Sequence, residues 1–251
     1  MIINTGIVFA AILALSGLEL VLAFIYPMVP RERRMRLCSD FEQLGTRLIF
    51  GLFRVFRGFR VKISNPSNIV IPDRCLVIAN HQSLLDILVL MSILGPERMP
   101  RFVAKKELEY GIPLVSFCLR KGGHCLIRRH GAPIDTMRAI SRMAKRCREA
   151  GASPVVFPEG TRSRDGRLRQ FHSAGVRRIL EVDSLPVLAV AIDGGWKVAT
   201  LRDFLRRFGK EPYEVAIAGL YPAPHGKSAI EVMLEDSRSR IAQALGREDM
   251  M

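Results

Sequence analysis

From Val61 onward, short apolar runs alternate with longer stretches in which apolar residues recur at helical spacing. The short runs predict strands, and the longer stretches predict helices. Strands that alternate with helices indicate an α/β domain, with a central, mostly parallel or mixed sheet flanked by helices. We assign this domain to residues 61–251. The expected strands are Val61–Ser64, Cys75–Ala79, Phe102–Ala104, Cys125–Arg128, Val155–Phe157, Val187–Ile192 and Glu214–Ala218, and the expected helices are Leu84–Leu94, Pro113–Arg120, Pro133–Ala150, Ala174–Val182 and Ser228–Leu245.

Residues 1–60 have a different pattern. Between Met1 and Pro30 the only charged side chain is Glu19, and Ile7–Val29 is long enough to cross about 30 Å of hydrocarbon as a helix. No Lys or Arg precedes the apolar stretch, which argues against a cleaved signal peptide. The arginines that come after it (Arg31, Arg33, Arg34 and Arg36) favour a cytoplasmic location for its C-terminal side. Because Glu19 is costly in lipid, the sequence leaves two alternatives: a spanning helix, or a helical hairpin broken at Gly17 that dips into one leaflet.

Residues 47–60 predict an amphipathic basic helix. Its apolar face holds Leu48, Ile49, Leu52, Phe53, Val55, Phe56 and Phe59, and its arginines (Arg47, Arg54 and Arg57) cluster on the other face. Such a helix fits a membrane interface, and it fits equally a helix packed on the domain core. We expect residues 1–60 to form an N-terminal membrane anchor and interfacial helix.

The net charge of the chain indicates which kinds of partner it binds. The formal net charge is +14 in 251 residues, which points to a polyanionic partner such as nucleic acid, anionic lipid or a phosphorylated substrate. Aromatic residues make up only 7% of the chain and are mostly Phe in apolar runs, so no stacking platform for nucleic acid is indicated. The five cysteines form no Cys-x-x-Cys pair, which argues against a disulfide framework or a zinc site and fits a reducing compartment.

A histidine and an aspartate come directly after the expected strand Cys75–Ala79. Residues 80–86 read Asn-His-Gln-Ser-Leu-Leu-Asp, which places His81 at the carboxyl end of the strand and Asp86 in the first turn of the next helix. Open α/β sheets bind ligands at this edge. Asp86 can reach one imidazole nitrogen and leave the other as a base, which is the base-and-orienter pair of a catalytic triad. A capping Asp beside a structural His is the alternative for this motif alone.

A second polar motif lies at the end of the expected strand Val155–Phe157. Residues 157–163 read Phe-Pro-Glu-Gly-Thr-Arg-Ser. Gly160 permits an unusual backbone conformation or close approach of a ligand, and Arg162 offers a planar fork of donors suited to phosphate. Alone, this motif would also fit a polar turn with an exposed arginine. The two motifs together suit the transfer of an acyl group to the hydroxyl of a phosphorylated acceptor.

With these motifs the chain resembles the lysophosphatidic acid acyltransferase family (1-acyl-sn-glycerol-3-phosphate O-acyltransferases), within the glycerolipid acyltransferases. His81 to Asp86 matches the family's His-x4-Asp motif, and Phe157 to Ser163 matches its third motif in full. Two further segments also fit: Ala104 to Leu108, and Leu185-Pro186-Val187 leading into residues 190–192. The resemblance runs from about residue 60 to residue 195.

The resemblance implies an activity and its residues. His81, oriented by Asp86, would deprotonate the free sn-2 hydroxyl of 1-acyl-glycerol-3-phosphate, which attacks the thioester of acyl-CoA or acyl carrier protein and gives phosphatidic acid. The implied substrate-binding residues are Lys105, Arg129, Glu159, Gly160, Thr161 and Arg162. No metal or other cofactor is implied. The implied partners are an anionic phospholipid membrane, a lysophospholipid and the acyl donor, with no nucleic acid. The implied location is the cytoplasmic face of the inner or plasma membrane.

One block departs from the family pattern. The second motif usually reads Gly-x-x-Phe-Ile-Asp-Arg, whereas residues 123–129 read Gly-His-Cys-Leu-Ile-Arg-Arg. Arg129 keeps the arginine used for the acceptor phosphate, but Arg128 replaces the acid. A related acyltransferase that acts on another lysophospholipid or a lyso-aminolipid is therefore an alternative. A basic, membrane-docked binding protein without chemistry is a second one, in which the His-x4-Asp motif would have no purpose.

Overall fold

The computed structural model describes residues 2–128, 131–209 and 212–246, and its centre is a seven-stranded sheet. The strand order is β1-β7-β6-β2-β5-β3-β4. All neighbouring strands are parallel except β6 and β7, which are antiparallel, so the sheet is mixed as predicted. The strands are β1 (Val61–Ser64), β2 (Leu76–Ala79), β3 (Arg101–Lys105), β4 (Cys125–Ile127), β5 (Pro154–Val156), β6 (Val187–Asp193) and β7 (Tyr213–Tyr221).

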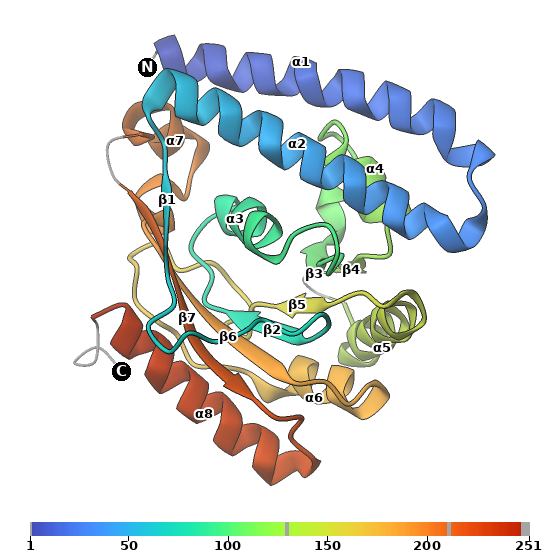
Figure 1. Cartoon of the computed structure of the whole chain (residues 1–251), viewed down its shortest axis with the longest axis vertical. Coiled ribbons are helices and arrows are strands. Elements are labelled where there is room, and N and C mark those ends of the chain that lie inside the picture. The colour runs from blue at the N-terminus through green and yellow to red at the C-terminus, as the bar shows by residue number, and fades with distance from the viewer. Residues whose placement is uncertain (1, 129–130, 210–211, 247–251) are drawn as a thin grey trace.

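Helices cover both faces of the sheet (Figure 1). On one face lies α3, covered in turn by the antiparallel pair α1 and α2, and on the other lie α5, α6 and α8. The helices are α1 (Ile2–Ile25), α2 (Arg34–Arg57), α3 (Leu85–Leu94), α4 (Val115–Lys121), α5 (Pro133–Ala150), α6 (Ser173–Val182), α7 (Leu201–Arg207) and α8 (Gly226–Ala244).

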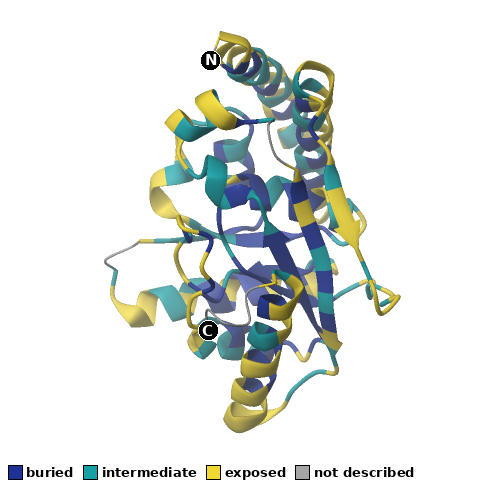
Figure 2. Cartoon of the chain, turned by 90° about the vertical axis from the view of Figure 1, so that its left-hand side faces the viewer, coloured by how far each residue is buried: buried dark blue, intermediate teal, exposed yellow. Residues whose placement is uncertain are grey.

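Strand β2 shows why the sheet is covered on both sides. All four of its residues are buried, and successive side chains of a strand point to opposite faces. Leu76 and Ile78 belong to the core under α5, α6 and α8, whereas Val77 and Ala79 belong to the core under α3. Continuous apolar runs of this kind are typical of buried parallel strands. The buried strands form a continuous layer through the molecule in Figure 2.

The structure confirms the expected strands and helices of residues 61–251, with shifts of up to a few residues at their ends. It differs at α7, which the sequence did not predict. It also differs at the hairpin, because α1 continues through Gly17 and the chain turns at Tyr26–Arg33 instead. A single glycine weakens a helix by about 1 kcal/mol without ending it. The turn contains Pro27 and Pro30, and Arg34 closes it by donating to the carbonyls of Pro27 and Val29 at 3.2 and 2.9 Å.

Helix α1 lies along the domain and is held near both of its ends. At one end, the amide of Asn4 donates to the carbonyl oxygens of Phe204 and Leu205 at 3.1 and 3.0 Å. Toward the other, the carboxylate of Glu19 accepts a hydrogen bond from the backbone N–H of Leu114 at 3.1 Å. Glu19, whose charge would be costly in lipid, therefore points toward the domain and binds its backbone. Of the described residues, Ile2–Met28 is the one helical stretch long and apolar enough to cross a membrane.

A buried ionic cluster joins α2 to the sheet. Glu42 of α2 accepts from Arg101 Nη1 at 3.0 Å and contacts His124 Nε2 at 2.7 Å. The side chain of Arg101 is fully buried and also donates to the carbonyl of Met35 at 2.8 Å. Burial alone would raise the pKa of Glu42, but His124 and Arg101 together hold it below its usual value. Such a cluster is costly to disrupt from one side, because it leaves a buried charge unpaired.

Candidate active site

The two sequence motifs meet at one edge of the sheet. Strands β2 and β5 pair in parallel, with Val77 opposite Val155, so their carboxyl ends lie side by side. His81 lies just beyond the end of β2, and the segment Phe157–Ser163 begins at the end of β5. The topology thus explains why two motifs some eighty positions apart form one site, as expected for the ligand-binding edge of an α/β sheet.

His81 and Asp86 form a hydrogen-bonded pair. The distance from His81 Nδ1 to Asp86 Oδ2 is 2.8 Å. The same oxygen accepts the backbone N–H groups of Gln82 and Ser83 at 2.6 and 2.8 Å. Because this carboxylate only accepts, Nδ1 carries the proton in the neutral imidazole, and the lone pair of Nε2 is then free. Asp86 is fully buried, whereas the imidazole keeps 15% of its surface exposed.

The second motif fixes the backbone of His81. The N–H of His81 donates to Glu159 Oε1 at 2.7 Å, and its carbonyl accepts the N–H of Ser163 at 2.7 Å. The ring of Phe157 stacks on the imidazole with centroids 4.0 Å apart and an interplanar angle of 15°. Backbone and ring are therefore both held, which is the preorganisation that a general base requires.

Glu159 is buried, and its carboxyl group binds two backbone N–H groups of the site. Its second oxygen accepts the N–H of Arg169 at 3.0 Å, and only 4% of the residue is exposed. Burial raises the pKa of Glu159 to about 7, although the two backbone N–H groups act in the opposite direction. Its contacts in the structure are with the backbone of His81 and Arg169. A direct contact with substrate, as the resemblance implies, stays a prediction.

The raised pKa of Glu159 predicts a pH-dependent loss of stability. Between its ordinary value of 4.5 and about 7 the folded protein keeps a proton that the unfolded chain has lost, so the carboxyl stabilises the fold at acid pH and progressively less as the pH rises. The full effect is about 3 kcal/mol. We expect the Tm of the native protein to fall relative to that of Glu159→Gln, which does not titrate at this position, between pH 4.5 and pH 7.5. A difference that is constant over this range, measured by thermal unfolding, would contradict it.

Sequence reasoning missed several residues around the pair. Gln82 Oε1 accepts the N–H groups of Gly195 and Trp196 at 3.0 and 3.3 Å, which draws the segment after β6 over Asp86. The hydroxyl of Tyr213, at the start of β7, donates to Asp86 Oδ1. The Gly-Gly pair directly after β6 was a visible signal of a close approach. No local pattern linked Tyr213 to Asp86, because they are 127 positions apart.

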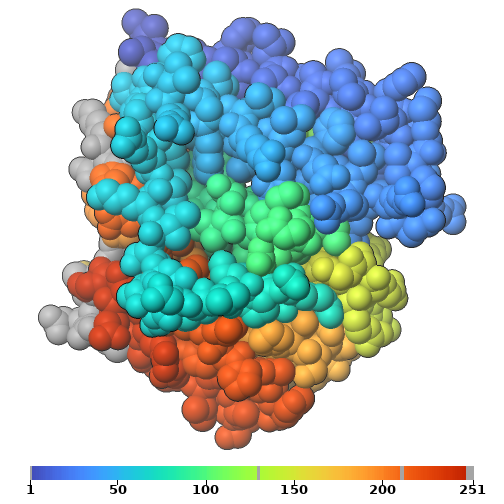
Figure 3. Space-filling view, viewed as in Figure 1, coloured from blue at the N-terminus to red at the C-terminus, as the bar shows by residue number. Residues whose placement is uncertain are grey.

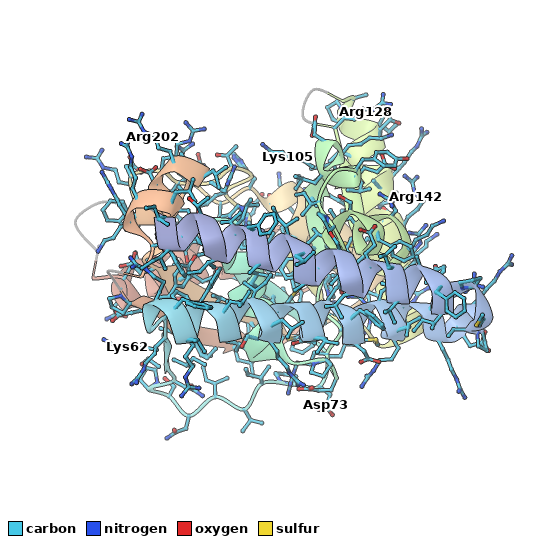
Figure 4. The ribbon with its side chains drawn as sticks, turned by 90° about the horizontal axis from the view of Figure 1, so that it is seen from above. Lys62, Asp73, Lys105, Arg128, Arg142 and Arg202 are labelled. Atoms are coloured by element: carbon cyan, nitrogen blue, oxygen red, sulfur yellow. The ribbon has the colours of Figure 1, made fainter. Side chains whose placement is uncertain are left out.

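The other predicted residues lie around this edge or outside the described part of the chain. Lys105, at the end of β3, and Arg128, just after β4, are exposed, and they project on the same side of the molecule in Figure 4. Arg162 is half-buried and donates to the carbonyl of Ala199 at 3.4 Å. Thr161 and Gly160 are exposed in the turn, where Gly160 has a φ of +69°. Arg129 lies outside the described residues. Among residues 2–128, 131–209 and 212–246 no group of three or more His, Cys, Asp or Glu side chains is placed to hold a metal ion.

Fold and site together define an α/β protein with a hydrogen-bonded His–Asp pair at the carboxyl edge of its sheet. The family model described as Acyltransferase matches residues 60–193, just over half of the chain. The chain therefore belongs to the acyltransferase family, and the resemblance indicated by its motifs is confirmed.

Relatives and a solved structure agree with this assignment. The chain is 25% identical over 246 residues to 1-acyl-sn-glycerol-3-phosphate acyltransferase BAT2, chloroplastic, of Brassica napus, covering 96% of this chain and 66% of that protein. It is 29% identical over 173 residues to 1-acyl-sn-glycerol-3-phosphate acyltransferase of Pseudomonas aeruginosa, covering 68% of this chain and 63% of that protein. The crystal structure of the 1-acyl-sn-glycerophosphate (LPA) acyltransferase PlsC from Thermotoga maritima has the same fold, with a TM-score of 0.73 at 21% identity, over 98% of this chain and 95% of that one. The chain thus spans just under two thirds of the curated relatives' length.

Proposed function

We propose that the protein transfers a fatty acyl group from a thioester donor, acyl-CoA or acyl carrier protein, to the sn-2 hydroxyl of 1-acyl-glycerol-3-phosphate, giving phosphatidic acid. The observation that carries the proposal is the pair His81–Asp86, joined at 2.8 Å at the carboxyl edge of the sheet. Its hydrogen bonds leave Nε2 as a proton acceptor. The activity for which the relatives are named supports the choice of acceptor.

The tautomer of His81 determines the chemistry. Nε2 of His81 removes the proton of the acceptor hydroxyl as its oxygen attacks the carbonyl carbon of the thioester. Asp86 stabilises the imidazolium that forms, because its buried carboxylate faces Nδ1–H. When the tetrahedral intermediate collapses, the carbon–sulfur bond breaks and the leaving thiolate takes the proton from Nε2. The ester, the thiol and the neutral imidazole are then all accounted for, without an acyl-enzyme.

The cationic side chains at this edge support an anionic acceptor. Lys105 and Arg128 are exposed there, and Arg162 lies in the turn that holds His81. A bidentate guanidinium suits the phosphate of the acceptor, and the net charge of +14 draws anionic substrates toward the protein. We propose Lys105, Arg162 and Arg129 as phosphate contacts and Gly160 and Thr161 as part of the acceptor pocket.

A second candidate is transfer to another lysophospholipid. It is favoured by Arg128, which is exposed just after β4 where the family pattern has an acid. Transfer of labelled acyl groups to a panel of lysophosphatidic acid, lysophosphatidylglycerol and lysophosphatidylethanolamine separates the two. We expect lysophosphatidic acid to give the highest kcat/KM. A higher value for another acceptor would select the second candidate, and no transfer to any of them would overturn the proposal.

We further propose that α1 and α2 dock the protein on the cytoplasmic face of a membrane without spanning it. The pair forms one outer layer of the molecule (Figure 3). Away from the domain, α1 presents exposed apolar side chains at helical spacing: Ile2, Phe9, Leu13, Leu20 and Phe24. Asn4 and Glu19 hold the opposite side of α1 to the domain, so a spanning helix would have to give up both contacts. An apolar stripe above a basic protein suits an anionic bilayer.

Phe9→Asp is expected to weaken membrane binding strongly, because Phe9 is 70% exposed and a charge there would have to enter the interface. The matched control is Val232→Asp, because Val232 is 67% exposed and belongs to α8, the helix on the opposite side of the domain from α1 (Figure 1). Co-sedimentation with vesicles of phosphatidylglycerol and phosphatidylcholine measures both. Equal binding of the two variants would contradict docking through α1.

A further inference from the structure

We infer that Tyr213 is a positioning residue for the base, acting through Asp86. This inference rests on the proposed acyl transfer. The hydroxyl of Tyr213 donates to Asp86 Oδ1, while Oδ2 accepts His81 Nδ1–H and the backbone N–H groups of Gln82 and Ser83. Tyr213 is thus the partner that the structure gives to the second oxygen of the orienting carboxylate. It lies beyond residues 60–193, the part of the chain that the family model matches.

The surroundings of this hydrogen bond exclude water and leave no room for a side chain at position 195. Tyr213 is 2% exposed and Asp86 is fully buried, so water does not compete for the contact. Gly195 packs directly against the two groups: a Cβ at this position would lie 2.4 Å from the Tyr213 hydroxyl and 2.9 Å from Asp86 Oδ1. Any larger residue at 195 would force the pair apart. Burial, together with the nearby charge of Asp86 as the smaller cause, raises the pKa of Tyr213 well above its ordinary value, so the hydroxyl stays a donor.

The geometry of a carboxylate gives this contact a consequence for catalysis. Two oxygens held by opposing donors fix the plane of the group, and the plane determines how Nδ1–H of His81 is oriented. Without the Tyr213 hydroxyl, Oδ1 is buried without this donor and the carboxylate is free to turn toward another one. Tyr213 itself is buried, and its hydroxyl reaches the site through Asp86. The loss should therefore appear in the chemical step and leave substrate binding nearly unchanged.

Tyr213→Phe tests the inference, with Tyr221→Phe as its matched control. Tyr221 ends the same strand, and its hydroxyl donates to Asp236 Oδ2 at 2.7 Å on the exposed surface. Both variants lose one phenol-to-carboxylate hydrogen bond. We expect Tyr213→Phe to lower kcat by about 10- to 100-fold, with KM for both substrates nearly unchanged. Tyr221→Phe should keep the kcat of the native protein.

A double-mutant cycle with Asp86→Asn separates positioning from a merely structural role. If Tyr213 acts through the carboxylate, Tyr213→Phe has little further effect on kcat once Asp86 is Asn. An equal fold-decrease in both backgrounds would overturn the inference. Thermal unfolding first checks that each variant is folded. If Tyr213→Phe is not, 3-fluorotyrosine at position 213 keeps the ring and hydroxyl and changes the strength of the donor. An unchanged kcat would then count against the inference.

The proposed acyl transfer and the role of Tyr213 are contradicted by different results. If the native protein transfers no acyl group to any lysophospholipid, the proposed function is wrong. If the native protein is active and Tyr213→Phe has the kcat of Tyr221→Phe, the function stands and the role of Tyr213 is wrong.

Discussion

Replacing His81 with Ala is expected to reduce acyl transfer by about 10²–10⁴-fold, the usual contribution of a positioned base. The thioester is already reactive, so the variant lacks only the group that makes the acceptor hydroxyl a nucleophile. The side chain of His81 is at the end of a strand and contacts Phe157 and Asp86, so the fold should survive its removal. Steady-state transfer to lysophosphatidic acid measures the effect.

The control for this variant is His225→Ala. His225 is an exposed histidine immediately before α8, remote from the carboxyl edge of β2. It should keep native activity, and both variants should bind vesicles like the native protein. Activity of His81→Ala equal to that of His225→Ala would exclude His81 as the base.

Asp86→Asn is expected to be as severe, with a loss of up to about 10⁴-fold. An amide whose oxygen takes the place of Oδ2 still accepts from Gln82, Ser83 and His81, but its NH2 group then faces the Tyr213 hydroxyl, which donates to Oδ1 in the native protein. The amide is neutral, so the imidazolium that forms during the reaction loses the negative charge that stabilises it. The loss should fall on kcat, because Asp86 is fully buried and acts through His81.

Asp203→Asn is the matched control, because Asp203 also lies in the first turn of a helix but is only partly buried on α7, where it contacts Thr200. It should change kcat little. If Asp86→Asn retained the kcat of Asp203→Asn, the carboxylate would be a helix cap and not the orienter of His81.

The sequence was sufficient to predict the sheet and the meeting of the two motifs. Strands such as Leu76–Ala79 are buried on both faces, so they appear as short, continuous apolar runs whose position needs no tertiary information. Parallel strands bring the segments at their carboxyl ends to one edge of the sheet. This rule is enough to place His81 beside the segment 157–163, where the structure has it.

The amphipathic helix predicted over residues 47–60 fitted both a membrane interface and the domain core, and its apolar face contacts both solvent and the core in the structure. Phe53 is buried against Phe208 of the domain, with ring centroids 4.4 Å apart, whereas Val55 and Phe56 are exposed. Arg57, expected on a solvated face, donates instead to the carbonyl of Phe208 at 3.0 and 2.7 Å. Helical spacing gives the direction of a side chain but not the surface opposite it.

The contacts that hold His81 and Asp86 in place could not be predicted from the sequence, for a related reason. Glu159 was expected in the acceptor pocket, but its contacts in the structure are with the backbone of His81 and Arg169. Tyr213 contacts Asp86 across 127 positions. Such contacts depend on the register of strands and the path of loops, which leave no periodic signal in the chain.

The most direct test of the account is a single-turnover reaction with labelled acyl-CoA and excess purified protein, with and without lysophosphatidic acid. Direct attack by the acceptor predicts that label enters phosphatidic acid, at the sn-2 position, only when the acceptor is present. It also predicts that the protein itself carries no label when the acceptor is absent, and that His81→Ala forms product far more slowly. Label bound covalently to the protein, or no phosphatidic acid from the native protein, would contradict the account.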